Sequence, residues 1–197
     1  ERLFGLVGSE MCIRDRIGAT KEALELIGRE SSGYNALLRQ LSDQIQDPFL
    51  SAIIVGKYHR AMELKTELAL DPESWMSNIG HSSRSEKIVT ILGNLLENAL
   101  EASASSGEQK KVCLSMTDVG NELIFEVEDS GSGISEDQQK SIFDEGFTTK
   151  TGTGRGIGLQ LVQKNLIQLE GHLTVGESSL GGARFTAYIP KTISKED

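Results

Sequence analysis

The chain has 197 residues, of which 38% are hydrophobic and 25% charged, with a formal net charge of −9 at pH 7. These fractions are typical of a soluble globular protein with room for one ordinary domain and a smaller attachment. The acidic balance argues against nucleic acid as a partner, because nucleic-acid-binding proteins present a basic surface. No apolar run approaches the ~20 residues of a membrane helix. Two cysteines, Cys12 and Cys113, make neither a disulfide framework nor a metal site.

The segment from Gly5 to Arg16, GLVGSEMCIRDR, stands apart from the rest of the chain. It resembles the in-frame translation of a transposase adapter used in sequencing libraries. We therefore expect residues 1–16 to be an artefact and exclude them from the fold. We also expect the natural sequence that preceded Ile17 to be missing.

Residues 17–65 carry two helical patterns. From Thr20 to Gln46 apolar residues recur at three- and four-residue spacing, and the glycines and serines of 28–33 weaken the middle. Asp47-Pro48 predicts the start of a second helix that runs to about Lys65, with Asp47 as N-cap and Pro48 at the first helical position. Two amphipathic helices predict a hairpin that packs on another chain or on the missing segment.

Residues 66–191 alternate predicted helices and strands, and a charged tail, 192–197, follows. The alternation predicts an α/β fold, a two-layer sandwich with a mixed sheet. Strands are expected at 67–70, 111–117, 122–128, 172–175 and 183–189, and helices at 85–103 and 156–169, with an irregular polar segment at 72–84.

Polar residues on the 85–103 helix are the first candidates for chemistry. Asn94 and Asn98 are four residues apart and so lie on one helical face, with Glu97 and Glu101 close by. Amide and carboxylate oxygens are the ligands that Mg²⁺ prefers. Taken alone, the pattern equally fits the solvated face of an amphipathic helix.

Two glycine clusters follow. In the first, Asp129 precedes Gly131 and Gly133, so that a carboxylate able to accept a hydrogen bond from an adenine amino group stands beside residues that permit close approach. The second runs from 152 to 158 and opens a helix whose N-terminal N–H groups would bind phosphate, flanked by Lys150 and Arg155. The first cluster alone also fits an ordinary turn. Together the two clusters indicate a nucleotide site.

The order of these motifs resembles the ATP-binding catalytic domain of sensor histidine kinases, the fold shared with gyrase, mismatch-repair and Hsp90-type ATPases. The resemblance covers about Glu67 to Pro190. It implies that ATP and Mg²⁺ bind, with Asn94 and Asn98 as the metal box, and Asn98 as the more direct ligand. It also implies nucleotide contacts from the adenine box, the hinge, the phosphate lid and the final glycine pair: Asp129, Gly131, Gly133, Phe143, Phe147, Thr149, Lys150, Gly152, Gly154, Arg155, Gly156, Ile157, Gly158, Leu159 and Gly182.

The upstream residues are similar to those of the citrate and C4-dicarboxylate sensor kinases. Asp47-Pro48-Phe49-Leu50 and the stretch 55–61 look like their second dimerisation helix, and residues 18–23 look like the stretch after their phosphoacceptor helix. This likeness implies a homodimer formed through the N-terminal helices and a response regulator as partner. It also implies a cytoplasmic location, with attachment to the inner membrane only through a missing N-terminal part.

The position of Asn94 bears on the reaction. ATPases of the fold have a glutamate there that activates water, and an amide is neither base nor nucleophile at neutral pH. We therefore expect phosphotransfer to histidine, with Asn94, Lys150 and Arg155 as the catalytic groups. The alternatives are an ATPase of the same fold and an anti-sigma-like regulator that uses the fold for partner recognition.

The acceptor histidine is expected to be absent. The family's acceptor precedes an acidic residue on the first dimerisation helix, where this chain has the adapter-like segment. His59 precedes Arg60 on the second helix, His81 lies in a polar loop and His172 opens a strand. None fits the pattern, so we expect the chain to bind Mg·ATP without phosphorylating itself.

Overall fold

The computed structural model describes residues 32–80, 82–107, 110–135, 138 and 157–192. The adapter-like segment and most of the phosphate lid lie outside these residues. The chain divides into two compact units, residues 1–39 and residues 40–197. In the described part of the first unit, residues 32–39 are helical, and the helix continues to residue 44.

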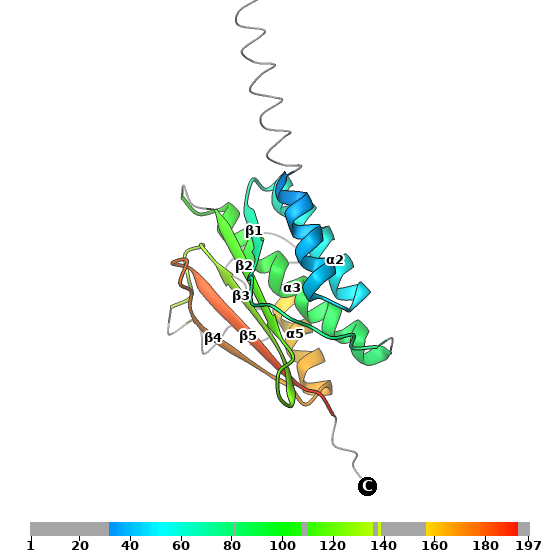
Figure 1. Ribbon diagram of the computed structural model, residues 1–197. Coiled ribbons are helices and arrows are strands. Elements are labelled where there is room, and N and C mark those ends of the chain that lie inside the picture. Colours follow the sequence, from blue (N-terminus) through cyan, green and yellow to red (C-terminus); the bar gives the residue numbers. More distant parts are fainter. Residues whose placement is uncertain (1–31, 81, 108–109, 136–137, 139–156, 193–197) are drawn as a thin grey trace, which may run out of the picture. The chain divides into compact units, whose positions relative to one another are not determined.

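The second unit is a five-stranded sheet with helices on one side (Figure 1). The sheet order is β1-β2-β3-β5-β4, in which β1 and β2 are parallel and the other neighbouring pairs antiparallel. The mixed sheet and the α/β class are as predicted. The elements are α2 (Pro48–Glu63), β1 (Glu67–Leu70), α3 (Ser83–Ala104), β2 (Lys111–Thr117), β3 (Glu122–Asp129), α5 (Ile157–Gln168), β4 (His172–Glu177) and β5 (Ala183–Pro190).

The core lies between the helices and the sheet. In β2 and β3 buried residues alternate with half-exposed ones, as expected for a sheet with one covered face. Phe125 of β3 is fully buried, paired on one side with Met116 of β2 and on the other with Ala187 of β5. Along α3 the buried side chains recur at helical spacing, among them Ile88, Leu92, Leu95, Leu96 and Leu100.

Helix α2 begins where the sequence predicts. Asp47 is buried, and its Oδ1 accepts hydrogen bonds from the N–H groups of Phe49 at 3.0 Å and Leu50 at 2.9 Å. Its Oδ2 accepts from the N–H of Ile79 at 3.1 Å, which joins the helix start to the segment before α3. The N-cap therefore fixes both the start of α2 and its place in the second unit.

Helix α2 differs in one respect from its expected role in a hairpin. It packs on α3 and β1, within the second compact unit, residues 40–197. The physical reason is apolar burial: Leu50, Ile54 and Ala61 of α2 are almost fully buried.

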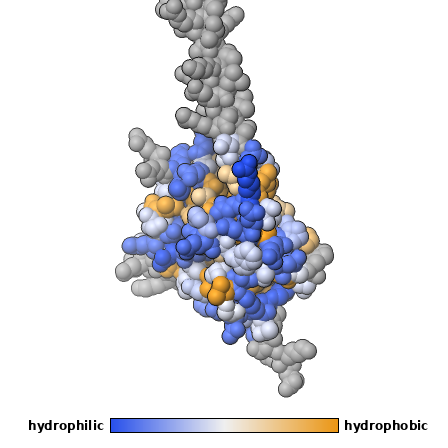
Figure 2. All heavy atoms as spheres, in the orientation of Figure 1, coloured by the Kyte–Doolittle hydropathy of each residue, from blue (hydrophilic) through white to orange (hydrophobic). Residues whose placement is uncertain are grey.

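The face shown in Figure 2 is largely hydrophilic, with apolar residues in separate small groups. Exposed large apolar side chains such as Val119 and Ile167 are ordinary features of a protein surface when they occur singly. Among the described residues, no helix is both long and apolar enough to cross a membrane.

Candidate functional site

The carboxylate of Asp129 forms one end of the candidate site. Asp129 ends β3 and is only 3% exposed. Its Oδ1 accepts hydrogen bonds from the N–H of Gly131 at 2.8 Å and from the N–H of Ala183 at 3.1 Å. Burial raises the pKa of Asp129, and the two N–H groups offset part of that rise. Both of these hydrogen bonds are made at Oδ1.

The chain segments around Asp129 pack so closely that they leave no room for a side chain at Gly131 or Gly182. A Cβ added at Gly182 would lie 2.2 Å from Asp129 Oδ1 and 2.5 Å from the Gly131 nitrogen. A Cβ added at Gly131 would lie 2.8 Å from the same oxygen and 2.9 Å from Cβ of Ala102 on α3. Gly133 has a φ of +72°, a conformation that glycine adopts at little cost. Three glycines thus pack the turn after β3 against α3 and the start of β5.

The two asparagines of α3 face the start of α5. The Nδ2 of Asn94 donates to the carbonyl oxygen of Thr90 at 2.7 Å, which fixes the amide and directs Oδ1 away from that carbonyl. A Cβ added at Gly158 would lie 3.1 Å from Asn94 Oδ1 and 3.7 Å from both amide atoms of Asn98. Gly158 therefore allows the first turn of α5 to approach both asparagines closely.

One face of α3 connects the two ends of the site. This face, which we call the α3 stripe, consists of Asn94, Asn98 and Ala102. The three residues are spaced by four positions and so follow one another along the helix. At a rise of about 1.5 Å per residue, the stripe extends roughly 12 Å from the α5 contact to the Asp129 turn. A helix N-terminus suited to phosphate and a buried carboxylate suited to an adenine amino group thus lie at opposite ends of this stripe. That arrangement fits a nucleotide.

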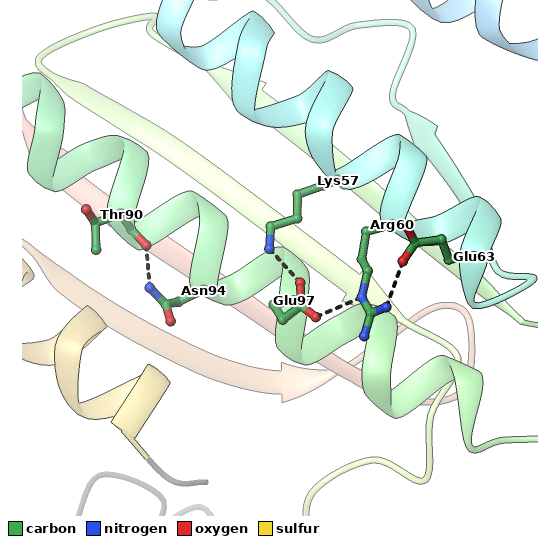
Figure 3. Close-up of polar contacts among 6 residues, drawn as sticks. All are labelled: Lys57, Arg60, Glu63, Thr90, Asn94 and Glu97. Atoms are coloured by element: carbon green, nitrogen blue, oxygen red, sulfur yellow. Dashed lines mark hydrogen bonds and ion pairs between the residues drawn. The ribbon is translucent and has the colours of Figure 1, made fainter. Parts of the chain in front are cut away.

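The structure corrects the expectation that Glu97 lies among the oxygen ligands of a metal. The sequence places it among the oxygen ligands close to the asparagines, but its carboxylate is bound by Lys57 Nζ at 2.5 Å and Arg60 Nε at 3.2 Å (Figure 3). Burial alone raises the pKa of Glu97, but the hydrogen bonds and charges of Lys57 and Arg60 outweigh it and lower the pKa below its ordinary value. Glu97 is therefore directed to α2.

The amide oxygens of the asparagine pair fit Mg²⁺. They are hard donors, and Mg²⁺ commonly takes only one or two protein ligands, with nucleotide phosphates and water completing its octahedron. The side chain of Ile157 and eight further predicted contact residues lie outside the part that the structure describes: Phe143, Phe147, Thr149, Lys150, Gly152, Gly154, Arg155 and Gly156. Leu159 lies half-exposed on the first turn of α5.

Sequence reasoning missed the backbone donor from Ala183 and the cations that bind Glu97. A backbone N–H carries no residue signature, so its role at Asp129 depends entirely on how β5 meets β3. Lys57 lies 40 residues from Glu97 in the sequence, and no spacing rule connects them. The glycine pair Gly181-Gly182 before β5 was the sequence signal that pointed to the hydrogen bond between Ala183 and Asp129.

Comparison with known families decides the identity of this fold. Residues 83–193, more than half of the chain, match the family described as histidine kinase-, DNA gyrase B-, and HSP90-like ATPase. The chain belongs to this family. The match spans α3, the Asp129 turn, α5 and β5, which are the elements that form the candidate site.

Within the histidine kinase-, DNA gyrase B- and HSP90-like ATPase family, the chain is similar to sensor kinases over most of its length. It is 42% identical to the sensor protein CitS of Halalkalibacterium halodurans over 92% of this chain and 34% of that protein. It is 36% identical to the sensor histidine kinase CitA of Klebsiella pneumoniae over 87% of this chain and 31% of that protein. The chain thus spans about a third of the length of these relatives.

A solved structure agrees. The catalytic domain of histidine kinase ThkA superposes with a TM-score of 0.62 at 26% identity, over 73% of this chain and 91% of that domain. The resemblance to the citrate and C4-dicarboxylate sensor kinases is confirmed by these relatives, and residues 83–193 are a domain of the histidine kinase-, DNA gyrase B-, and HSP90-like ATPase family.

Proposed function

We propose that the second unit, residues 40–197, is a catalytic unit. It binds Mg·ATP along the α3 stripe and transfers the γ-phosphoryl group to a histidine of a dimerisation helix. The observation that carries the proposal is the contact between the asparagine pair and the first turn of α5. It sets hard oxygen donors beside a helix N-terminus, so that Mg²⁺ held by those oxygens and the N–H groups of the helix would neutralise a polyphosphate from both sides.

Each group has a part in this proposal. Asp129 Oδ2 accepts a hydrogen bond from the adenine amino group while Oδ1 stays bound to its two N–H donors. Asn98 and Asn94 hold Mg²⁺, which supplies charge neutralisation at the phosphates. The N–H groups at the start of α5 orient the phosphate chain. Lys150 and Arg155 add charge-assisted hydrogen bonds to the phosphates.

Phosphotransfer is favoured over hydrolysis by what surrounds Asn94. Its amide is neutral at all ordinary pH values and cannot abstract a proton from water. The nearest carboxylate on α3, Glu97, is held by Lys57 and Arg60 and is not placed as a substitute base. In a histidine kinase the attacking nucleophile is a histidine on a separate protein segment, and this histidine needs no base from α3. The surroundings of Asn94 therefore suit a kinase better than an ATPase.

The metal role of Asn98 is testable by substitution. We expect Asn98→Ala to weaken binding of an ATP analogue mainly when Mg²⁺ is present, on the order of tenfold, because one ligand is lost. Calorimetric titrations in Mg²⁺ and in EDTA measure this difference. An equal loss in both conditions would contradict the ligand role.

No described histidine is suited to be the acceptor. His59 lies exposed on α2 and precedes Arg60, and His172 is stacked on Tyr188 with ring centroids 4.7 Å apart. His81 lies outside the described residues. We therefore propose that the acceptor belongs to a dimerisation helix not encoded in this chain, and that residues 17–65 are the remainder of that region.

Incubation with γ-labelled ATP tests the reaction. We expect no acid-labile label on the isolated chain, and transfer of label to an added domain that carries the first dimerisation helix of a sensor kinase relative. Acid-labile label on the chain itself would contradict the missing acceptor. Steady release of phosphate without transfer would favour an ATPase.

The wider setting follows from the same proposal. The phosphorylated histidine would pass its phosphoryl group to the receiver domain of a response regulator. The complete protein would act as a homodimer joined through its N-terminal helices. Membrane attachment would be made by segments upstream of this chain, with the catalytic unit on the cytoplasmic side.

A further inference from the structure

A charge cluster joins α2 to α3 beside the candidate site. Lys57 Nζ lies 2.5 Å from Glu97 Oε2, and Arg60 Nε lies 3.2 Å from Glu97 Oε1. Figure 3 shows both cations reaching from α2 to the same carboxylate on α3. The side chains of Lys57 and Glu97 are only 18% and 30% exposed. Because both carboxylate oxygens are engaged by one helix, the cluster fixes the side chain in direction as well as in distance.

Helix α2 also packs closely on α3 one helical turn before the charge cluster. A Cβ added at Gly93 would lie 3.4 Å from Cδ1 of Ile53, an ordinary van der Waals distance, so Gly93 of α3 lies directly against Ile53 of α2. From Ile53 to Lys57 and from Gly93 to Glu97 the step is one helical turn in each case. Successive turns of α2 thus contact successive turns of α3, first by apolar packing and then by charge.

The contact residues on α3 are the immediate neighbours of the asparagine pair. Gly93 precedes Asn94, and Glu97 precedes Asn98. Consecutive residues of a helix point about 100° apart, so the asparagines project from the flank next to the one that α2 covers. Helix α3 therefore contacts both α2 and α5, and the residues that α2 contacts lie on the same two turns of α3 as the asparagines.

We propose that Lys57 and Arg60 are positioning residues that act through Glu97 to set the asparagine pair for the Mg·nucleotide. The inference rests on the proposed function, since it concerns the same metal-holding helix. The chain enters the catalytic unit through residues 40–47 and α2. Displacement of α2 would weaken Mg²⁺-dependent nucleotide binding, and by linkage a bound Mg·nucleotide would hold α2 in place.

The experiment compares two variants that break the cluster with one that does not. Lys57→Met removes a cation from Glu97, and Glu97→Gln removes the charge that both cations bind. Glu63→Gln is the matched control, because Glu63 binds Arg60 at 2.9 Å within α2 and makes no contact across to α3 through this pair. Lys57→Arg keeps the charge and serves as the conservative variant.

The readout is the affinity for a non-hydrolysable ATP analogue, measured by calorimetry on the full chain in Mg²⁺ and in EDTA. We expect Lys57→Met and Glu97→Gln to lose on the order of tenfold in Mg²⁺ and little in EDTA, the size typical of groups that orient metal ligands. Glu63→Gln and Lys57→Arg should match the parent in both conditions. Equal losses with and without Mg²⁺, or no loss at all, would overturn the inference.

A measurement on the parent chain does not depend on variants that fold. Hydrogen exchange of the α2 backbone amides should slow when Mg·analogue is added, and should slow less with the analogue in EDTA. If the chain binds Mg·analogue but the exchange rates of the α2 amides do not change, the inference is overturned. A parent chain that binds no Mg·analogue would overturn the proposed function itself, and the inference with it.

Discussion

Replacement of Asp129 by asparagine is expected to weaken binding of an ATP analogue by about 2 kcal/mol, roughly thirtyfold. Oδ1 of Asp129 accepts from two backbone N–H groups, those of Gly131 and Ala183. An asparagine must keep its own oxygen at that position, because its amide nitrogen cannot accept from either donor. The NH₂ group would then occupy the position of Oδ2 and present a donor toward the donor amino group of adenine.

Isothermal calorimetry measures this loss, and the stability of the variant is its control. Burial raises the pKa of Asp129 in the folded chain, so the ionised carboxylate is disfavoured by folding. The stability associated with this group is fully present below its unfolded pKa and is lost as pH rises through its raised folded pKa. The melting temperature of Asp129→Asn relative to the parent should therefore rise with pH across this range.

The two measurements together separate binding from folding. An Asp129→Asn chain that melts as high as the parent at neutral pH, yet binds the analogue weakly, supports the adenine assignment. Unchanged affinity would refute it. A guanine nucleotide serves as a further probe, because guanine carries an oxygen where adenine has its amino group, and the variant should discriminate less between the two.

Replacement of Gly182 by alanine is expected to destabilise the chain by about 3 kcal/mol, near the upper end of the usual range for overpacking. The new Cβ would lie 2.2 Å from Asp129 Oδ1 and 2.5 Å from Asp129 O, and one of these obstacles is main chain. The carboxylate or the turn after β3 must move. Both the melting temperature, by roughly 6–12 °C, and the nucleotide affinity should fall.

The neighbouring glycine supplies the matched control. Gly181 has a φ of +93°, and a Cβ added there meets nothing within 4 Å. Gly181→Ala should therefore cost about 1–2 kcal/mol through backbone strain alone, with the nucleotide affinity retained. The contrast in analogue binding between the two alanine variants is the decisive result. Full affinity in a folded Gly182→Ala chain would show that the Asp129 turn tolerates the displacement.

Much of the fold was predictable because local periodicity survives in the structure. The alternation along 111–117 and 122–128 predicted two strands with one covered face, and β2 and β3 have it. Four-residue spacing placed Asn94 and Asn98 on one face of a helix, and both lie against Gly158. Asp47-Pro48 predicted a helix start through capping chemistry that involves only the next few residues.

Other features depend on which distant segments pack together. The helical spacing of α2 predicted an apolar face but not its partner, since the same face would suit a hairpin or another chain. Packing against α3 settled it, through Gly93 and Ile53. From the sequence, the glutamate at 97 fitted either a metal ligand or the solvated face of a helix, and in the structure two cations from α2 bind it.

By itself the sequence determined the order of the elements, the face that carries the asparagines and the carboxylate that ends β3, because each follows from backbone geometry over a few residues. Only the tertiary structure decided that Asp129 is held by an N–H 54 residues away, and that Glu97 turns toward α2. Such contacts arise where β5 meets β3 and α2 meets α3, and no local pattern encodes which surfaces will meet.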